Sequence, residues 1–209
     1  MDYQLLWCDI ETTGTDRKLD HVLEVACFIT DENLNIIDES FKVWLIDPGN
    51  NDWKVRLIDN PVVLEMHSKN GLIKDLTDSS RSKFRPISFV TDFYSYLGKH
   101  QFGASKYRMA GSGVAHFDKD FLTQYCDRVC EETQHSPQTS PFYDETLFDY
   151  ATIDVGHVRR FLRDVVGRED LLPPDEGVGV THRAFDDICD HYKSAVHYKN
   201  VLGSITCQS

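Results

Sequence analysis

The stretch Leu5-Leu6-Trp7-Cys8-Asp9-Ile10-Glu11-Thr12-Thr13-Gly14 passes from an apolar run into two carboxylates and a glycine. The apolar residues predict a buried β-strand, on which side chains two positions apart point to the same face. Asp9 and Glu11 should therefore be neighbours, where like charges repel each other and a bound cation would relieve the repulsion. Gly14 ends the strand and lets other backbone approach closely. A plain acidic strand end is the simpler alternative, so the rest of the chain must supply further ligands.

Length and composition narrow the class of protein. The chain of 209 residues is long enough for one large domain, residues 1–209. A formal net charge of −12 argues against a surface that coats nucleic acid, but it permits a nucleic-acid enzyme with cations in its cleft. The six cysteines are scattered without zinc-type spacing, which is typical of reduced thiols. We find no signal peptide and no membrane-spanning apolar run, so we expect a cytoplasmic protein with no membrane partner.

The order of strand and helix patterns predicts an α/β fold. Apolar or alternating runs indicate strands over residues 5–14, 22–30, 36–46, 107–111 and 148–154. Helical spacing and start signals indicate helices over residues 61–67, 86–97, 116–132 and 155–166, and a last helix from 182 onward. The first three strands should form an antiparallel meander, and the later ones should add parallel pairs to the same sheet. Residues 67–72 and 167–180 are predicted loops.

Two later segments supply further candidate ligands. Asp118 follows a strand and a glycine-rich turn, where an acid can point into a cleft, although an ordinary acid in a first helical turn is the alternative. His182 precedes the last helix, which begins with Asp186 and Asp187, and helix geometry alone does not decide which of them faces inward. We expect the core-facing stripe of that helix to consist of Phe185, Cys189, Tyr192 and Val196.

Together these residues have the composition of a phosphodiesterase site. Carboxylate oxygens are hard ligands that suit Mg²⁺ or Mn²⁺ rather than zinc. A carboxylate-rich site of this kind can hold two ions and cut a phosphodiester bond. Histidine exchanges a proton near neutral pH, so His182 is a candidate to take the proton of the attacking water.

Three ordered motifs resemble those of the DEDDh 3′–5′ exonucleases, whose fold is ribonuclease H-like. They are Asp9-Ile10-Glu11-Thr12-Thr13-Gly14, Val114-Ala115-His116-Phe117-Asp118-Lys119-Asp120-Phe121-Leu122 and His182-Arg183-Ala184-Phe185-Asp186-Asp187. The family's last Asp lies five residues after its His, which selects Asp187. Residues 66–72 and 150–155 also resemble segments of the oligoribonucleases within that family, and the likeness spans nearly the whole chain.

The resemblance implies a role for each candidate residue. Asp9, Glu11, Asp118 and Asp187 would hold two Mg²⁺ or Mn²⁺ ions, and His182 would be the general base. The residues implied to contact the substrate are Thr12, Thr13, Gly14, His67, Leu72 and Tyr150. Because oligoribonucleases are homodimers, Tyr150 would reach the site of a partner subunit. A tyrosine packed in the core is the alternative for Tyr150.

Four departures from the oligoribonuclease pattern bear on the substrate. Thr12 and Thr15 stand where that branch has Met and Leu, so the leucine that wedges against bases is absent. Gly156 replaces a serine that helps to grip a terminal phosphate, and Ala151 replaces an arginine. The turn before Asp118 is one residue longer than usual. These changes favour a broader 3′–5′ exoribonuclease over a dinucleotide specialist.

The sequence leaves three function classes to compare. The first is a metal-dependent exoribonuclease that releases nucleoside 5′-monophosphates from short or single-stranded RNA. The second is a 3′–5′ DNA exonuclease of the proofreading type, because the motifs are shared and no identified residue reads a 2′-hydroxyl. The third is a non-catalytic binding module of the same fold, which would be expected to have lost a carboxylate or the histidine.

Overall fold

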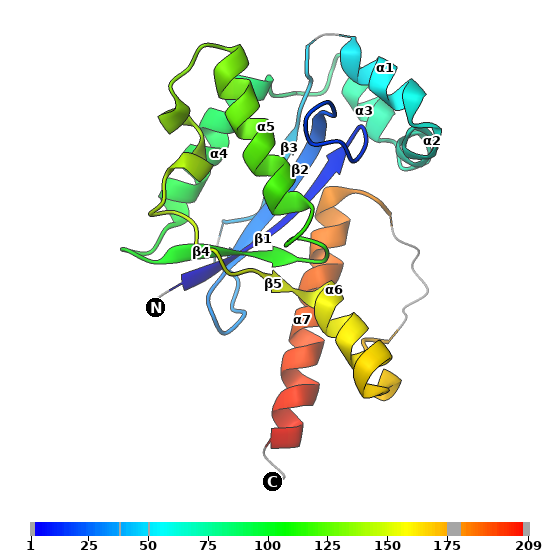
Figure 1. Ribbon diagram of the computed structural model, residues 1–209, viewed down its shortest axis with the longest axis vertical. Coiled ribbons are helices and arrows are strands. Elements are labelled where there is room, and N and C mark those ends of the chain that lie inside the picture. Colours follow the sequence, from blue (N-terminus) through cyan, green and yellow to red (C-terminus); the bar gives the residue numbers. More distant parts are fainter. Residues whose placement is uncertain (1–2, 38, 50, 175–180, 207–209) are drawn as a thin grey trace.

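A five-stranded mixed sheet forms the centre of the computed structural model, which describes residues 3–37, 39–49, 51–174 and 181–206 (Figure 1). Its strands are β1 (Tyr3–Thr12), β2 (Val22–Thr30), β3 (Lys42–Leu45), β4 (Lys106–Gly111) and β5 (Ile153–Asp154). They lie in the order β3-β2-β1-β4-β5. The β1–β2 and β2–β3 pairs are antiparallel, whereas β1–β4 and β4–β5 are parallel. The predicted meander and mixed sheet are confirmed.

Helices cover both faces of this sheet and one of its ends (Figure 1). The helices are α1 (Asp52–Asp59), α2 (Pro61–Lys69), α3 (Leu72–Thr77), α4 (Pro86–His100), α5 (Asp118–Glu132), α6 (Val155–Arg160) and α7 (Ala184–Thr206). Helices α4 and α5 pack on one face, and α6 and α7 pack on the other. Helices α1 to α3 gather near the carboxyl end of β1. No helix in the described ranges is long and apolar enough to cross a bilayer.

Strand β1 separates two hydrophobic cores. Leu6, Cys8 and Ile10 belong to the core under α4 and α5, whereas Leu5 and Trp7 belong to the core under α7. Side chains alternate along a strand, so Asp9 and Glu11 continue the row of Leu5 and Trp7. The two carboxylates therefore emerge on the α7 face of the sheet, just beyond its apolar core.

Two predicted strands are shorter than expected. The predicted strand 36–46 is reduced to β3, with Ile36 making one isolated bridge to Thr30. The predicted strand 148–154 is reduced to β5, with an isolated bridge between Phe148 and Tyr107. The side chain of Asp149 accepts hydrogen bonds from the Ala151 amide and from Arg108, which turns the chain away from the sheet.

The predicted loop over residues 67–72 is wrong, because helix α2 continues to Lys69 and helix α3 begins at Leu72. Gly71, with a φ of 82°, makes the sharp break between these helices. Helix α1, which precedes α2, was not predicted. Asn60 and Pro61 do stand at the predicted start of α2, although the Asn60 side chain does not cap it.

The predicted buried stripe of α7 is confirmed only in part. Tyr192 packs against the rings of Trp7 and Phe28 as predicted, but Phe185 is 41% exposed and meets the ring of Phe41. Among the described side chains of the helix, the buried ones are Ala184, Ile188 and Tyr198. The start of the helix is held against β2 through the backbone of Ala184, so this small residue takes the inward position.

The remaining helical predictions agree in extent with the structure. The predicted helix 155–166 begins as α6 but continues as a π-helical segment, Phe161–Val166. Short 3₁₀ turns occupy Pro137–Thr139, Pro141–Tyr143 and Glu169–Leu171. In the predicted loop 167–180, residues 175–180 lie outside the described residues.

Candidate active site

Three carboxylates from two distant segments meet at the carboxyl end of β1. Asp9, Glu11 and Asp187 each offer one oxygen, and these oxygens lie within 4.8 Å of one another. The contact arises because α7 packs on the face of the sheet to which Asp9 and Glu11 point. Asp186, the other acid that the sequence left open, is exposed and accepts a hydrogen bond from Thr181 instead.

The electrostatics of this cluster reflect burial and a local excess of negative charge. Burial raises the pKa of Glu11 to about 9, and the neighbouring Asp187 and Glu24 carboxylates add to the effect. Burial also raises the pKa of Asp9 well above its usual value, with further repulsion from Asp118 and Glu11. The pKa of Asp187 rises to about 6, chiefly through burial. Crowded acids of this kind become stable anions when a cation lies among them.

Asp118 approaches the same group from α5. It is only 4% exposed, unlike an ordinary acid in a first helical turn. Burial raises its pKa to about 7, although hydrogen bonding to the backbone at Asp118 and Ile10 partly opposes the rise. The contact with Ile10 places this carboxyl beside the strand residue between Asp9 and Glu11. Asp118 is therefore next to the cluster without belonging to the 4.8 Å group.

His182 lies at the rim of the cluster, just before α7. Its side chain is exposed, and its proximity partly opposes the rise in the pKa of Asp187. Its backbone has a φ of 50°, a left-handed conformation that a residue with a side chain rarely adopts. The Asn70 side chain donates a hydrogen bond to the carbonyl of His182. A contact with α2–α3 therefore holds this unusual conformation.

The turn after β1 is tightly packed. The Thr12 hydroxyl donates to the carbonyl of Gly14 at 2.6 Å, and the Thr13 hydroxyl donates to Asp20 at 2.9 Å. A Cβ on Gly14 would lie 2.5 Å from an Asp20 oxygen and 2.9 Å from the Asn60 amide nitrogen. Only glycine fits there without displacing these neighbours. The turn is therefore a rigid backbone surface next to the carboxylates.

His67 and Leu72 are fully buried, although the resemblance placed them along the substrate. His67 Nε2 lies 2.8 Å from the carbonyl oxygen of Thr12, and its Nδ1 lies 3.9 Å from Glu11 Oε2. Burial lowers the pKa of His67, so the ring is neutral and Nε2–H is the donor to Thr12. Leu72 packs in a small core near α1 and α3 whose other buried members are Leu23, Trp53, Leu57 and Leu76.

Tyr150 lies on the surface, with 93% of it exposed. The alternative of a tyrosine packed in the core is therefore wrong. Lys119 donates hydrogen bonds to the carbonyls of Asp149 and Tyr150, each at 3.1 Å, and these hold the backbone while the ring projects outward.

Sequence reasoning missed Glu24 and Arg183, which lie beside the cluster. Glu24 is opposite Glu11 in the β1–β2 register and is buried. Its guanidinium partner, Arg183, directly follows His182. The sequence did carry a signal for Glu24, because it is the acid in the middle of the otherwise apolar strand 22–30. A buried charge of this kind needs a charged or hydrogen-bonding partner.

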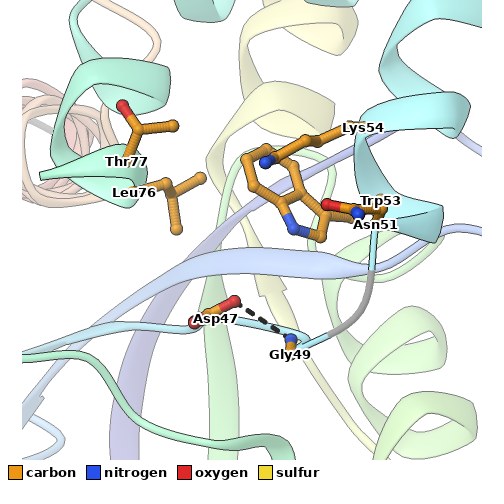
Figure 2. Close-up of a pocket in the computed structure, with 7 residues that line it drawn as sticks. All are labelled: Asp47, Gly49, Asn51, Trp53, Lys54, Leu76 and Thr77. Atoms are coloured by element: carbon orange, nitrogen blue, oxygen red, sulfur yellow. Dashed lines mark hydrogen bonds between the residues drawn. The ribbon is translucent and has the colours of Figure 1, made fainter. Parts of the chain in front are cut away.

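A surface pocket of about 330 Å³ lies elsewhere, between α1, α3 and the turn after β3 (Figure 2). Its lining residues are Asp47, Gly49, Asn51, Trp53, Lys54, Leu76 and Thr77. None of the carboxylates of the cluster lines it. We therefore locate the candidate site by the meeting of the carboxylates and not by this pocket.

Comparison with solved structures identifies the fold. Exonuclease I of E. coli in complex with a dT13 oligonucleotide aligns with 99% of this chain at a TM-score of 0.65 and 15% identity. Its zinc-bound complex with single-stranded DNA aligns with 96% at a TM-score of 0.63 and 15% identity. The chain spans about two fifths of these longer proteins, 43% and 41%. The shared fold is that of the ribonuclease H-like exonucleases.

Curated relatives then identify the family. The oligoribonuclease of Mycobacterium leprae is 30% identical over 200 residues, covering 95% of this chain and 81% of the relative. The mitochondrial oligoribonuclease of Homo sapiens is 28% identical over 209 residues, covering 96% and 73%. No family model matches the chain. The chain belongs to the oligoribonuclease family of DEDDh 3′–5′ exonucleases.

Proposed function

We propose that residues 1–209 act as one exonuclease domain that releases nucleoside 5′-monophosphates from the 3′ end of short or single-stranded RNA. The observation that carries this proposal is the meeting of Asp9, Glu11 and Asp187 within 4.8 Å. These acids come from opposite ends of the chain, and bringing them together costs electrostatic energy. A site that binds cations and phosphate accounts for this cost, because strongly shifted carboxyl groups gather at functional sites.

The residues present fit a divalent metal centre. Asp9, Glu11 and Asp187, with Asp118 beside them, offer only oxygen ligands, and their raised pKa values reflect a local excess of negative charge. We propose that they hold two Mg²⁺ or Mn²⁺ ions, which prefer such ligands. When bound, the ions supply positive charge that activates water and stabilises the leaving oxygen.

The chain's own groups would supply the remaining chemistry. We propose that His182, exposed at the rim, accepts the proton of the attacking water. The backbone of Thr12, Thr13 and Gly14 is proposed to meet the 3′-terminal nucleotide. Because His67 and Leu72 are buried, we propose that they support this substrate surface from beneath.

RNA is proposed as the substrate because the curated relatives are named oligoribonucleases. Exonuclease I of E. coli, which has a similar fold, was solved in complex with a DNA oligonucleotide, which keeps a DNA exonuclease as the alternative. Matched end-labelled RNA and DNA oligomers of graded length, digested with Mg²⁺ or Mn²⁺, would separate the two. We expect a ladder shortening from the 3′ end with RNA lost faster, and faster loss of DNA would overturn the RNA assignment.

A homodimer is proposed on the exposure of Tyr150. Its ring projects from a fixed backbone, and Phe161 and Val165 are further exposed apolar side chains near it in sequence. Such residues suit a contact with a second copy. Sedimentation should give a dimer at working concentration, and Tyr150→Ala should lower the activity of that dimer. A monomeric active enzyme would remove Tyr150 from the site.

A cytoplasmic location is proposed on the cysteines. In the described part of the chain, Cys8, Cys27, Cys126, Cys130 and Cys189 are free thiols, as suits a reducing compartment. Three of the relatives are mitochondrial proteins by name. Fractionation of cells that make the tagged full-length chain would test the location, and recovery in an organelle would overturn it.

A further inference from the structure

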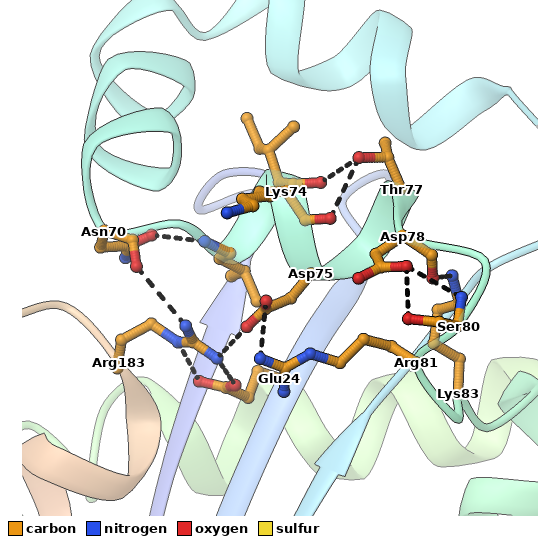
Figure 3. Close-up of polar contacts among 12 residues, drawn as sticks. Glu24, Asn70, Lys74, Asp75, Thr77, Asp78, Ser80, Arg81, Lys83 and Arg183 are labelled. Carbon is orange, nitrogen blue, oxygen red and sulfur yellow. Dashed lines mark hydrogen bonds and ion pairs between the residues drawn. The ribbon is translucent and has the colours of Figure 1, made fainter.

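A partly buried ion pair joins the start of α7 to β2 and to α3 (Figure 3). Arg183 binds Glu24 with two parallel contacts, Nε to Oε2 at 3.1 Å and Nη2 to Oε1 at 2.6 Å. Its Nη2 also donates to Asp75 at 3.0 Å, and its Nη1 donates to the carbonyl of Asn70 at 3.4 Å. A planar guanidinium that meets a carboxylate in this way fixes both partners in orientation as well as distance.

Glu24 also holds the backbone of α7. The amide of Ala184, the first residue of the helix, donates to Glu24 Oε2 at 3.0 Å. This carboxylate therefore caps the helix from a different element, because an N-terminal amide has no partner within its own helix. Glu24 is only 2% exposed, so water competes little for either contact.

We call the contact of Arg183 and Ala184 with Glu24 the clamp, and the residues on either side of it belong to the candidate site. His182 precedes Arg183 in the chain, and the amide of Asp187 donates to the carbonyl of Arg183 at 3.0 Å. Asn70, whose backbone Arg183 binds, holds the carbonyl of His182 with its side chain. A change in the clamp would therefore move His182 and Asp187 together.

We propose that Arg183, held by Glu24, is a positioning residue that sets His182 and Asp187 against Asp9 and Glu11. This inference rests on the proposed exonuclease function. Arg183 acts through its neighbours, since its guanidinium is committed to Glu24, Asp75 and Asn70. Its positive charge also opposes part of the repulsion at Glu11, to which Glu24, opposite Glu11 in the sheet, contributes.

The test compares Arg183→Lys, Glu24→Gln and the double variant with wild type. Lysine keeps the charge but loses the planar pair, and glutamine keeps the shape but loses the charge. We expect each single variant to lower kcat about 10–100-fold and to weaken Mn²⁺ binding, measured by calorimetry, by a similar factor. The KM for RNA should stay within about twofold of wild type because neither side chain is proposed to touch substrate. The double variant should be no worse than the more impaired single variant, as expected of partners in one contact.

Arg168→Lys is the matched control. Arg168 makes the same two-contact pair with Asp170, Nε to Oδ1 at 2.8 Å and Nη2 to Oδ2 at 2.7 Å, on the exposed surface. It should leave kcat and Mn²⁺ affinity unchanged. Rates are divided by the folded fraction from thermal unfolding, so loss of stability alone cannot imitate the result.

The outcomes separate this inference from the proposed function. Wild-type kcat and Mn²⁺ affinity in either single variant would overturn the positioning role, as would an equal loss in the Arg168→Lys control. If Arg183→Lys does not fold, Glu24→Gln decides the question by the same two measurements. If wild-type protein cuts neither RNA nor DNA, the proposed function fails, and the Mn²⁺ affinities still test the clamp.

Discussion

At the scale of single residues, the main feature is a set of acids placed where they repel one another. Asp9 illustrates the conflict, because its pKa is raised by burial and by the carboxylates of Asp118, Glu11, Asp187 and Glu24. Such an arrangement lowers the stability of the metal-free protein. The arrangement makes physical sense if binding a cation returns more free energy than the repulsion among these carboxylates costs in the metal-free protein.

Asp9→Asn should therefore separate stability from activity. The substitution keeps the shape and removes one charge, so the metal-free protein should gain about 1–2 kcal/mol, a rise in Tm of roughly 2–8 °C for a chain of this size. Hydrolysis of RNA should fall at least about 100-fold, because removing one ligand weakens the metal centre. Thermal unfolding in EDTA and an end-labelled RNA assay give the two readings. Undiminished hydrolysis would contradict the metal site and favour a non-catalytic reading of these acids.

His182→Ala should have a different effect. Loss of a general base lowers turnover about 10²–10⁴-fold, but the carboxylates remain, so Mn²⁺ affinity should change less than about twofold. Single-turnover hydrolysis and calorimetry measure these quantities. His135→Ala is a matched control, since His135 is also exposed but its ring nitrogen pairs with Thr133, away from the carboxylates. A variant at His182 with wild-type turnover would show that another group takes the proton.

At the scale of elements, the site depends on how α2 and α7 lock onto the sheet. Helix α2 reaches β1 through buried His67, whose ring contacts the carbonyl of Thr12 and the carboxyl of Glu11. Helix α7 reaches β2 through Arg183 and Glu24. Helices α2 and α3, predicted in part as a loop, thus serve as a support for both the strand end and His182.

His67→Ala should test the first of these contacts. It leaves the Thr12 carbonyl without a partner in a buried place, which costs about 1–3 kcal/mol, and the lost ring volume adds to the cost. The urea midpoint should fall accordingly, and RNA hydrolysis should fall as the turn beside Glu11 loosens. Ser68→Ala, at the next position, should change stability by less than about 0.5 kcal/mol because Ser68 is exposed. An unchanged midpoint for His67→Ala would contradict the supporting role.

At the scale of the whole molecule, the cluster should govern how stability responds to pH. The folded-state pKa values of Glu11, Asp118 and Asp187 rise to about 9, 7 and 6. Unfolded carboxyls titrate near pH 4, so between about pH 4 and 9 the folded state retains protons that the unfolded state has released. These retained protons stabilise the folded state. Their contribution to the free energy of unfolding is complete below about pH 4 and is lost as pH rises through the folded-state pKa values.

The metal-free protein should therefore lose stability from about pH 5 to 9, whereas saturating Mg²⁺ should reduce the loss because ionised carboxylates bind it. Thermal unfolding across this range, in EDTA and in Mg²⁺, measures the difference. The formal net charge of −12 affects the measurements in EDTA and in Mg²⁺ alike. The difference between the two slopes of Tm against pH therefore reports on the carboxylate cluster. Parallel slopes would contradict the cluster as the metal centre.

Features that depend on local pattern could be predicted from the amino acids alone. The two-residue spacing of Asp9 and Glu11 fixed their common face, and the apolar runs predicted the meander, α4 and α5. The motif order predicted the family, and the five-residue interval from His182 selected Asp187 over Asp186. Each of these signals is short in range or carried by family resemblance, so no knowledge of packing was needed.

Packing between distant segments, in contrast, sets which face of the sheet the acids occupy and which residues surround them. The first turn of α7 was misjudged because capping by Glu24 turns Ala184, not Phe185, toward the sheet. The burial of His67, the exposure of Tyr150 and the pairing of Glu24 with Arg183 likewise join segments far apart in the chain. Side-chain period describes one element at a time, whereas these features depend on which elements meet and at what rotation.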